Sequence, residues 1–244
     1  MSAQSEQGVI VRGVGGFYYA RDERGGVHVL RARGVFRKRG LTPLVGDRIS
    51  FTPPQGEEHG WIEDILPRDN ELIRPPVANI GHLVFVLAPK PEPDYLLLDT
   101  MLVLARRQHI APVVVVNKCD LDESLADVLR TAYAGADLPV LAVSAQRGDG
   151  LDVLAEVLRE GICCFAGQSA VGKSTLLSAI TGLSLASGEM SRKTERGKNT
   201  TRHAELYTQN GFQVLDTAGF SLLELWDRMD PVDLKSYYPD FAPY

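Results

Sequence analysis

Short stretches of alternating apolar and polar residues, broken by turn residues, make up the first third of the chain. The stretches GVIVRGVGGFYYARD, GGVHVLRARG, VGDRISF and GWIEDIL follow one another, with Gly, Pro and Asp between them. This pattern is typical of short strands joined by turns. Five or so strands within residues 8–72 predict a small β-barrel of the oligonucleotide-binding type, although other small barrels would give a similar pattern.

From Gly81 onward the pattern changes to strands that alternate with helices. Continuous apolar runs of buried-strand length lie at residues 82–88, 112–116, 140–143 and 162–166. Apolar residues recur at helical spacing over residues 95–108, with Asp94 as the expected N-cap, and a second helix is expected over residues 151–158. This alternation predicts an α/β domain with a mostly parallel sheet and helices on both faces.

A Pro-rich stretch at residues 74–77 separates the two patterns. We therefore expect a barrel over residues 1–75, an α/β domain over residues 76–225 and a C-terminal extension over residues 226–244. Charge is also uneven: residues 1–75 hold eleven Lys and Arg against ten Asp and Glu, whereas the rest holds fifteen against twenty-one.

The amino-acid composition excludes several classes of protein. Of the 244 residues, 44% are hydrophobic and 23% are charged, as in ordinary globular proteins. A net charge of −5 excludes nucleic-acid binding by bulk positive charge but leaves room for a local basic patch. No apolar run is long enough to cross a membrane, and the first residues are too polar for a signal peptide, so we expect no membrane association. Three cysteines without a C-x-x-C pair predict a cytoplasmic protein with no disulfide framework.

The most specific motif is G-x-x-x-x-G-K-[ST], which follows an apolar strand and precedes a helix expected over residues 175–180. Its nine residues are Gly167, Gln168, Ser169, Ala170, Val171, Gly172, Lys173, Ser174 and Thr175. Glycines in such a loop let backbone N–H groups turn towards phosphate oxygens, and the helix N-terminus adds partial positive charge. Lys173 is expected to contact the β- and γ-phosphates, and Ser174 to bind Mg²⁺. A chance Gly-rich turn is the alternative.

A second pair of motifs bears on which base is bound. Asn117, Lys118, Cys119 and Asp120 follow the strand PVVVV, at the edge of the sheet where open α/β folds bind ligands. A carboxylate at Asp120 accepts hydrogen bonds from N1 and N2 of guanine, whereas adenine offers neither donor. Ser144 and Ala145 follow the next strand and are expected to contact the base from its other edge. Each of these tetrapeptides could be a simple turn, but together with the phosphate-binding loop they predict GTP or GDP rather than ATP.

The motif Asp216-Thr217-Ala218-Gly219 completes the set. It follows a strand expected over residues 212–215, so Asp216 is expected to hold Mg²⁺ and the Gly219 amide to meet the γ-phosphate. Residues 186–202, rich in Ser, Gly, Lys and Thr, are a candidate for a loop that Mg²⁺ and the γ-phosphate order. Thr200 and Thr201 are the candidates for the hydroxyl that closes over the metal, and Thr201 is favoured. A solvated basic loop without function is the alternative.

The order of these motifs is unusual, because Asn117 comes before Gly167 whereas Asp216 comes after it. Cutting a GTPase after its Asp-x-x-Gly strand and joining its old ends at residues 160–161 produces this order. The sequence thus predicts a circularly permuted GTPase, in which the segment after Phe220 is tethered directly to the Asp-x-x-Gly loop.

Over nearly its whole length the chain resembles the circularly permuted, small-ribosomal-subunit-dependent GTPases of the RsgA/YjeQ type. The resemblance rests on FYYARD, GVFRKRGLTPLVGDRI, ELIRPP, NKCD, GQSAVGKST, RGKNTTRHAEL and DTAGF. It implies an oligonucleotide-binding barrel, a permuted GTPase domain and action late in maturation of the small (30S) subunit. It further implies binding to the subunit and its rRNA in the GTP state, release on hydrolysis, and a monomer as the working form.

Three departures from the family pattern qualify the resemblance. The family's zinc domain begins shortly after the segment YYPDF, but no Cys/His cluster follows it here, so we expect no zinc. Asn199 stands where the family carries a His that has been proposed to help catalysis, which puts the hydrolytic step in doubt. Ala218 replaces the common Pro and is expected to matter little.

The catalytic group is the least defined part of the site. Phe220 occupies the position of the water-orienting Gln in Ras-like GTPases, and an apolar ring cannot align a water, so slow intrinsic turnover is expected. Lys173, Thr201, Gly219 and His203 are the candidates for catalysis, although a residue placed as His203 is, at the start of the following strand, more often structural. A GTP-responsive RNA-binding module with negligible hydrolysis is therefore the alternative to a GTPase.

A basic stripe over residues 31–39 is the candidate RNA contact. Within residues 31–48 six basic side chains face one acid, and Phe36 lies among them. Arginines with one aromatic ring suit RNA phosphates and one stacked base. A solvated strand face is the alternative interpretation.

Overall fold

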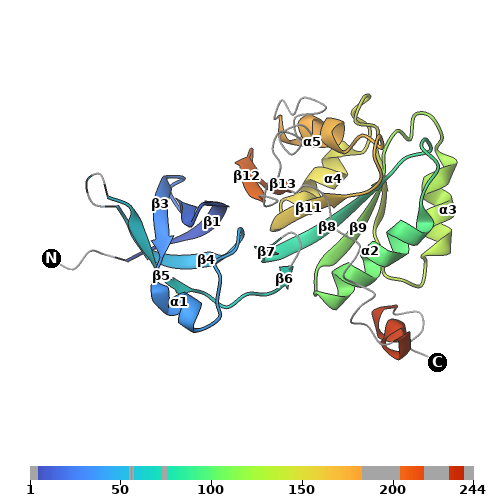
Figure 1. Cartoon of the computed structure of the whole chain (residues 1–244). Helices are drawn as coiled ribbons and strands as arrows, with labels where there is room; N and C mark the ends of the chain where they lie inside the picture. The colour runs from blue at the N-terminus through green and yellow to red at the C-terminus, as the bar shows by residue number, and fades with distance from the viewer. Residues whose placement is uncertain are drawn as a thin grey trace.

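The computed structural model of the 244-residue chain describes residues 5–54, 56, 58–72, 76–182, 204–216 and 231–238 (Figure 1). Two parts follow one another along the chain: a small barrel, and a larger layered α/β unit. Within the described residues, none of the helices combines the length and the apolar character that crossing a membrane needs.

The first five strands form a closed barrel. They are β1 (Glu6–Val14), β2 (Phe17–Asp22), β3 (Val27–Ala32), β4 (Arg48–Thr52) and β5 (Gly60–Ile65). They pair in the order β1-β2-β3-β5-β4, and β1 also pairs with β4, which closes the sheet. The β3–β5 pair is parallel and the others are antiparallel. Alternate residues point inward and are fully buried, as the sequence pattern predicts; they include Ile10, Leu30, Ile49, Phe51 and Ile62.

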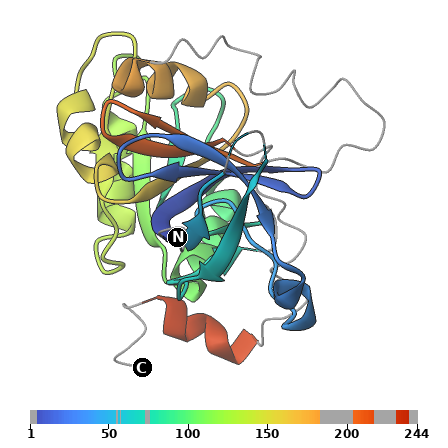
Figure 2. The same cartoon turned by 90° about the vertical axis from the view of Figure 1, so that its left-hand side faces the viewer.

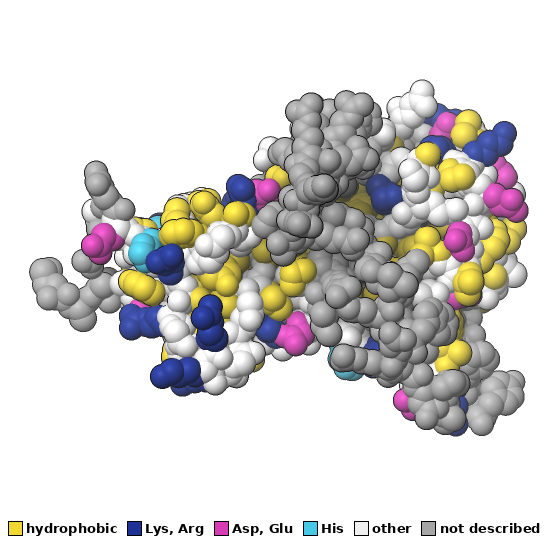
Figure 3. Space-filling model, viewed as in Figure 1, with side chains coloured by type: hydrophobic (Ala, Val, Ile, Leu, Met, Phe, Trp, Pro, Cys, Tyr) yellow, Lys and Arg dark blue, Asp and Glu magenta, His cyan; other side chains and the backbone are white. Residues whose placement is uncertain are grey.

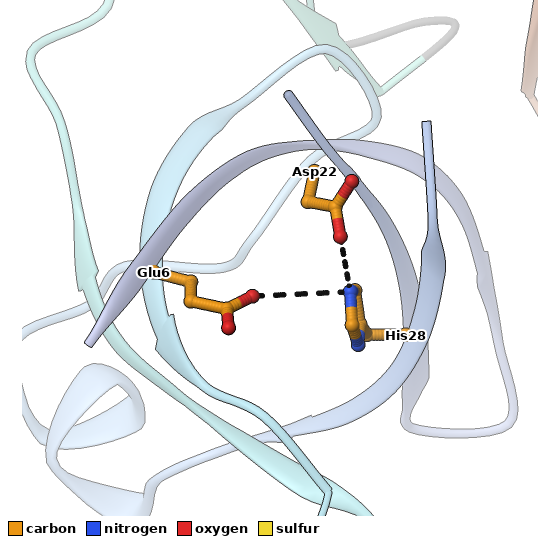
Figure 4. A group of neighbouring side chains, drawn as sticks. All are labelled: Glu6, Asp22 and His28. Atoms are coloured by element: carbon orange, nitrogen blue, oxygen red, sulfur yellow. Dashed lines mark hydrogen bonds and ion pairs between the residues drawn. The ribbon is translucent and has the colours of Figure 1, made fainter. Parts of the chain in front are cut away.

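The turn between β2 and β3 is held by one carboxylate. Asp22 Oδ1 accepts hydrogen bonds from the backbone N–H groups of Arg24 (2.9 Å) and Gly26 (2.8 Å), and Asp22 Oδ2 lies 2.7 Å from His28 Nε2. Glu6 reaches the same imidazole nitrogen at 4.0 Å (Figure 4). Three strands of the barrel thus meet at one polar cluster.

The basic stripe differs from its prediction. Arg31 belongs to β3, but the next residues form the short helix α1 (Gly34–Lys38) rather than a strand face. Phe36 points into the core from this helix and is only 2% exposed, so the expectation that it offers a stacking surface for a base is wrong. One turn of helix places every third or fourth residue on its inner side, and Phe36 is the large apolar residue on that side.

The barrel and the α/β unit are connected by short paired segments. β6 (Glu71–Leu72) and β7 (Val77–Ala78) pair with each other, and the backbone N–H of Ala78 donates to Val45 O at 2.9 Å. Apolar residues from the barrel, from β7 and from the larger sheet belong to one hydrophobic cluster. The two parts therefore share a continuous core.

The larger sheet has six strands: β8 (Ile80–Leu87), β9 (Ala111–Val116), β10 (Val140–Ala142), β11 (Ile162–Ala166), β12 (Glu205–Gln209) and β13 (Phe212–Asp216). Their order is β10-β9-β8-β11-β13-β12, and all neighbours are parallel except the β12–β13 pair. The outer strand β12 also pairs with β1 through Arg12 and Glu205, so the sheet continues into the barrel (Figure 2).

Helices cover both faces of this sheet, as predicted. α2 (Tyr95–Arg107) and α3 (Ser124–Ala132) pack on one face, whereas α4 (Leu151–Leu158) and α5 (Lys173–Thr181) pack on the other (Figure 1). Asp94 caps α2 by accepting from Leu97 N at 2.9 Å. Helix α3 is not predicted from the sequence, and α5 begins at Lys173, two residues before the predicted start. A 3₁₀ helix (Pro231–Tyr237) follows near α2, where Arg106 donates to Tyr237 O at 2.7 Å.

Candidate nucleotide-binding site

The predicted nucleotide motifs follow neighbouring strands of the larger sheet. The loop at residues 167–172 follows β11, Asn117 follows β9, Ser144 comes two residues after β10, and Asp216 ends β13. Because β8, β9, β10, β11 and β13 are parallel, these residues lie at one edge of the sheet. The carboxyl ends of parallel strands are where open α/β sheets bind ligands.

Two glycines shape the loop between β11 and α5. Gly167 has φ +130°, and a Cβ there would lie 2.2 Å from Val86 O. Gly172 has φ +93°, and a Cβ there would lie 2.5 Å from Asn117 Nδ2. A larger residue at either position would be strained and would collide with the neighbouring strand end. The loop therefore lies tight against the ends of β8 and β9.

Helix α5 begins at Lys173, so Ser174 and Thr175 lie in its first turn. The first N–H groups of a helix have no partner within the helix and carry partial positive charge. The loop and this helix end together form a surface suited to an anion. Ser169 and Ala170 are exposed at the top of the loop, whereas Val171 is fully buried beneath it.

Lys173 folds back over the loop. Its Nζ donates to the carbonyl oxygens of Gly167 (2.8 Å) and Gln168 (2.6 Å). Burial lowers the pKa of the Lys173 ammonium, because the charged form loses solvation. No carboxylate among the described residues pairs with Lys173, so its charge is available to an incoming phosphate.

Gln168 ties the loop to the segment that precedes α2. Its Nε2 donates to Glu92 O (3.0 Å), and its Oε1 accepts from Asp94 N (3.1 Å). Gln168 is predicted as part of the nucleotide-binding motif, and its contacts with Glu92 and Asp94 are not predicted from the sequence. Asp94 was predicted as a helix cap, and no sequence signal indicates that it also meets the loop.

Asn117 connects two of the motifs. Its side chain is 2% exposed; Nδ2 donates to Val171 O (2.9 Å) and Oδ1 accepts from Ala145 N (3.1 Å). Each end of the amide therefore has one partner within the protein, which leaves one N–H and one lone pair open. The structure brings Asn117, the phosphate-binding loop and Ala145 together.

Lys118 and Asp120 extend the same arrangement. Lys118 Nζ donates to Ala170 O (2.7 Å) and Lys90 O (3.1 Å), so its side chain lies along the outside of the loop. Asp120 Oδ1 accepts from Ser144 Oγ at 2.6 Å, and Ser144 is fully buried. The hydroxyl holds the carboxylate in one orientation while leaving its second oxygen as an acceptor.

Cys119 lies between them and its backbone N–H donates to Val143 O at 3.1 Å. Burial first, and then the carboxylates of Asp149 and Asp120, raise the pKa of the Cys119 thiol. The thiol is thus held protonated. The loop that starts at Ser144 contains a further hydrogen bond. In it, the backbone N–H of Arg147 donates to Ser144 Oγ at 3.2 Å.

Several predicted residues lie outside the part of the chain that the structure describes. Thr201, His203 and Gly219 are among them, as are Thr200, Asn199 and Phe220. Asp216 ends β13 opposite Glu205, and β13 pairs with β11 in parallel through Leu215 and Cys164. This pairing puts Asp216 at the same edge of the sheet as the phosphate-binding loop.

The residue types at this edge are those of a magnesium site. Ser174 lies in the first turn of α5, and Asp216 is the last residue of the strand β13. Hydroxyl and carboxylate oxygens, together with waters and phosphate oxygens, are the ligands that Mg²⁺ takes in nucleotide sites. No soft ligand occurs at either position.

Comparison with known families agrees with the geometry. Residues 65–226 match the family model described as RsgA GTPase, and residues 7–62 match the model described as RsgA N-terminal domain. The chain is 45% identical over 242 residues to a small ribosomal subunit biogenesis GTPase RsgA from Ruminiclostridium cellulolyticum, with 97% of this chain and 79% of that protein covered. The protein of the same name from Geobacillus thermodenitrificans is 43% identical over 245 residues, covering 98% of this chain and 82% of the relative.

Solved structures show the same architecture. YjeQ from Thermotoga maritima superimposes with a TM-score of 0.79 at 35% identity, over 96% of this chain and 81% of that one. YloQ, described as a circularly permuted GTPase, gives a TM-score of 0.76 at 32% identity, over 98% and 79% of the two chains. The predicted fold class, with its permuted GTPase order and its N-terminal barrel, is confirmed.

Proposed function

Because the chain belongs to the RsgA GTPase family, we propose that it hydrolyses GTP to GDP and phosphate during biogenesis of the small ribosomal subunit. The relatives named above carry this role in their names. The family implies a guanine nucleotide as the substrate and Mg²⁺ as its usual companion ion.

The observation that carries the proposal is the contact between Asp120 and Ser144. The hydroxyl fixes one carboxylate oxygen at 2.6 Å, beside a phosphate-binding loop that Asn117 holds in place. In this proposal Asp120 accepts hydrogen bonds from N1 and N2 of guanine. Adenine would leave the carboxylate without those donors, and an unsatisfied polar group in a binding site is a strong basis for rejection.

The phosphates are proposed to lie over residues 167–175. The backbone N–H groups of the loop and of the first turn of α5 would bind phosphate oxygens, and the Lys173 ammonium would leave the carbonyls of Gly167 and Gln168 for the β- and γ-phosphates. A water oxygen attacks the γ-phosphorus, the bond to the β–γ bridging oxygen breaks, and GDP leaves with that electron pair. The water's protons end on the released phosphate and on solvent.

The metal is assigned to Ser174, Asp216 and Thr201. When bound there, Mg²⁺ neutralises charge that develops on the phosphate oxygens. Ser174 and Asp216 come from adjacent elements, α5 and β13. Thr201 precedes β12 by four residues, so a hydroxyl that joins the metal would connect the GTP-bound state to the strand that pairs with the barrel.

The hydrolytic step is proposed to be slow without the ribosome. Phe220 provides no polar group to orient the attacking water, and Asn199 cannot act as a base. The Gly219 amide is assigned to the γ-phosphate and His203 to the water. In the GTP state the barrel would hold the subunit through its rRNA, and hydrolysis would release the protein, which acts as a monomer in the cytoplasm.

Turnover of GTP with and without purified small subunits tests this proposal. We expect strong stimulation by subunits and its loss in Lys173→Ala, with ATP turned over far less than GTP. GTP-dependent binding to subunits without any stimulated turnover would instead indicate a GTP-responsive RNA-binding module. Equal use of ATP and GTP would contradict the role of Asp120.

A further inference from the structure

Aromatic and arginine side chains form one row across the outer face of the barrel. Phe17 on β2 is the cross-strand partner of Arg31 on β3, and Arg31 is the partner of Trp61 on β5. Side chains at paired positions point to the same side of a sheet. Since Ile62 and Leu30, their neighbours along the strands, are fully buried, these three side chains point outward.

The side chains of this row contact one another, with the arginine over one ring and the rings edge-on or tilted to each other. The Arg31 guanidinium carbon lies 4.6 Å from the centre of the Phe17 ring. His59, just before β5, lies 5.0 Å from the Trp61 ring and 6.0 Å from the Phe17 ring, measured between ring centres. Trp61 is 39% exposed, which is a large exposure for an indole in a folded domain. We call Phe17, Arg31, His59 and Trp61 the aromatic row.

A second set of outward side chains lies beside the aromatic row. Arg12 is the partner of Tyr19, and its guanidinium carbon lies 5.5 Å from the Tyr19 ring centre; Tyr19 is in turn the partner of Val29. On the visible face of the barrel, Lys and Arg side chains are interspersed with hydrophobic ones (Figure 3). Two arginines and two aromatic rings therefore lie together on these strands, and the acid Glu205 is the partner of Arg12 on its other side.

We propose that the aromatic row stacks unpaired bases of a single-stranded RNA segment, while Arg12 and Arg31 contact the adjoining phosphates. The inference rests on the proposed function only in taking this RNA to be ribosomal. Aromatic rings and guanidinium planes on a barrel sheet are the means by which proteins bind unstacked bases. A duplex keeps its bases stacked inside, so this face fits single strands and not helical RNA.

The aromatic row lies on the outside of the barrel, as the stacking residue expected from the sequence, Phe36, does not. Phe36 is buried, so it cannot meet a base, whereas Trp61 and Phe17 offer ring surface on the outside of the same barrel. A protein partner would favour the exposed apolar side chains alone. The arginines near the rings favour RNA, because a guanidinium beside an aromatic ring offers a positive charge for a phosphate next to a flat surface for a base.

Fluorescence of Trp61 reports directly on the proposed contact. The chain has two tryptophans, so Trp226→Phe leaves Trp61 as the single indole. Titrating this full-length variant with a 12-nucleotide RNA of mixed sequence should quench the emission, and the same strand annealed to its complement should quench it far less. Anisotropy of the labelled single strand gives the affinity in parallel.

Substitutions within the row separate stacking from charge. We expect Trp61→Ala and Phe17→Ala each to weaken single-strand binding by about 5- to 150-fold, the range for losing one base–aromatic stack. Trp61→Phe should retain most of the affinity, and Arg31→Lys should keep the salt dependence but lose part of the affinity. Leu41→Ala is the matched control, because Leu41 is 41% exposed on the same barrel.

The outcomes distinguish this inference from the proposed function. Normal single-strand binding by Trp61→Ala and Phe17→Ala, with GTP binding intact in both, would overturn the inference while subunit-stimulated hydrolysis could still stand. Equal binding of duplex and single strand, or binding of the face to isolated ribosomal proteins and not to RNA, would overturn it as well. If subunits do not stimulate GTP hydrolysis by the wild type, but single-stranded RNA still quenches the Trp61 emission, only the proposed function would be rejected.

Discussion

Arg68 holds Asp47 in a two-point ion pair at the junction of the barrel and the α/β unit. Arg68 Nε lies 2.7 Å from Asp47 Oδ1, and Nη2 lies 2.8 Å from Oδ2. Asp47 is fully buried and also accepts from Leu44 N, while Arg68 also donates to Thr42 O. Its hydrogen bonds to Asp47 raise the pKa of Arg68. The pair therefore fixes the loop before β4 to the segment that leads to the larger sheet.

Removing the arginine from this pair should destabilise the protein strongly. Arg68→Ala leaves the Asp47 carboxylate buried without its partner, and we expect a loss of about 3–5 kcal/mol in the free energy of unfolding. Arg48→Ala is the matched control, because its pair with Asp69 is exposed on both sides, and it should cost no more than about 1 kcal/mol. Urea unfolding at neutral pH measures both, and similar losses for the two variants would contradict this account.

The sequence predicted most strands of the larger sheet. Strands such as residues 162–166 are continuous apolar runs, and burial on both faces explains why: Cys163 and Cys164 point to opposite sides and both are fully buried. Burial raises the pKa of the Cys163 thiol to about 12, which is consistent with a purely structural side chain. Helix α3 was missed because only Leu125, Ala126 and Leu129 mark its buried face.

The pairing of strands that are far apart in the chain could not be predicted from the sequence. The closure of the barrel by β1 and β4, and the contact of β1 with β12 through Arg12 and Glu205, join segments with no shared local pattern. The exposed Trp61 shows the same limit. Its alignment with Arg31 depends on a parallel β3–β5 pairing that no local pattern indicates.

The nucleotide motifs were recognised by spacing, but the internal contacts were not. Spacing identifies Asn117 as part of an Asn-Lys-x-Asp motif, and the structure adds that its amide bridges Val171 and Ala145. The first is a local property of the chain. The second depends on how β9, β10 and β11 align, which only the fold determines.

Asn117→Ala should therefore weaken nucleotide binding by loosening the phosphate-binding loop. The change leaves Val171 O and Ala145 N without their partner in a buried place, and unmade hydrogen bonds of this kind cost about 1–3 kcal/mol each. We expect GDP affinity to fall by about 10- to 100-fold, since about 1.4 kcal/mol corresponds to tenfold. Calorimetric titration with GDP measures this. Unchanged affinity, with a lower melting temperature alone, would limit Asn117 to folding.

Asp120→Asn should change which base is preferred. The carboxylate accepts from two guanine donors, whereas a side-chain amide offers a donor that suits the C2 oxygen of xanthine. Losing two charge-assisted hydrogen bonds should lower GDP affinity by about two to four orders of magnitude. Binding of xanthosine diphosphate should rise at the same time. Competition between the two nucleotides measures the switch, with Asp122→Asn, an exposed acid two residues away, as the control.

Acid stability should depend on the turn held by Asp22. Its hydrogen bond with His28, and then those from the Gly26 and Arg24 amides, keep the pKa of Asp22 below its usual range (Figure 4). A carboxyl whose folded pKa is depressed stabilises the fold above its unfolded pKa of about 3.9, and this contribution is lost as pH falls through the folded value. The ionised form therefore supports the β2–β3 turn at neutral pH.

Asp22→Asn should accordingly be less stable than the wild type at pH 7. The gap should begin to close near about pH 4, where the unfolded carboxyl takes up a proton, and should go on closing as the pH falls through the lower folded pKa. Urea unfolding from pH 7 down to pH 3 measures the two profiles. Glu23→Gln, which changes an exposed acid in the same turn, serves as the control and should follow the wild-type profile. A gap between wild type and Asp22→Asn that stays constant over this range would show that the substitution removes only contacts that do not depend on charge, and that the ionisation of Asp22 contributes nothing to the fold.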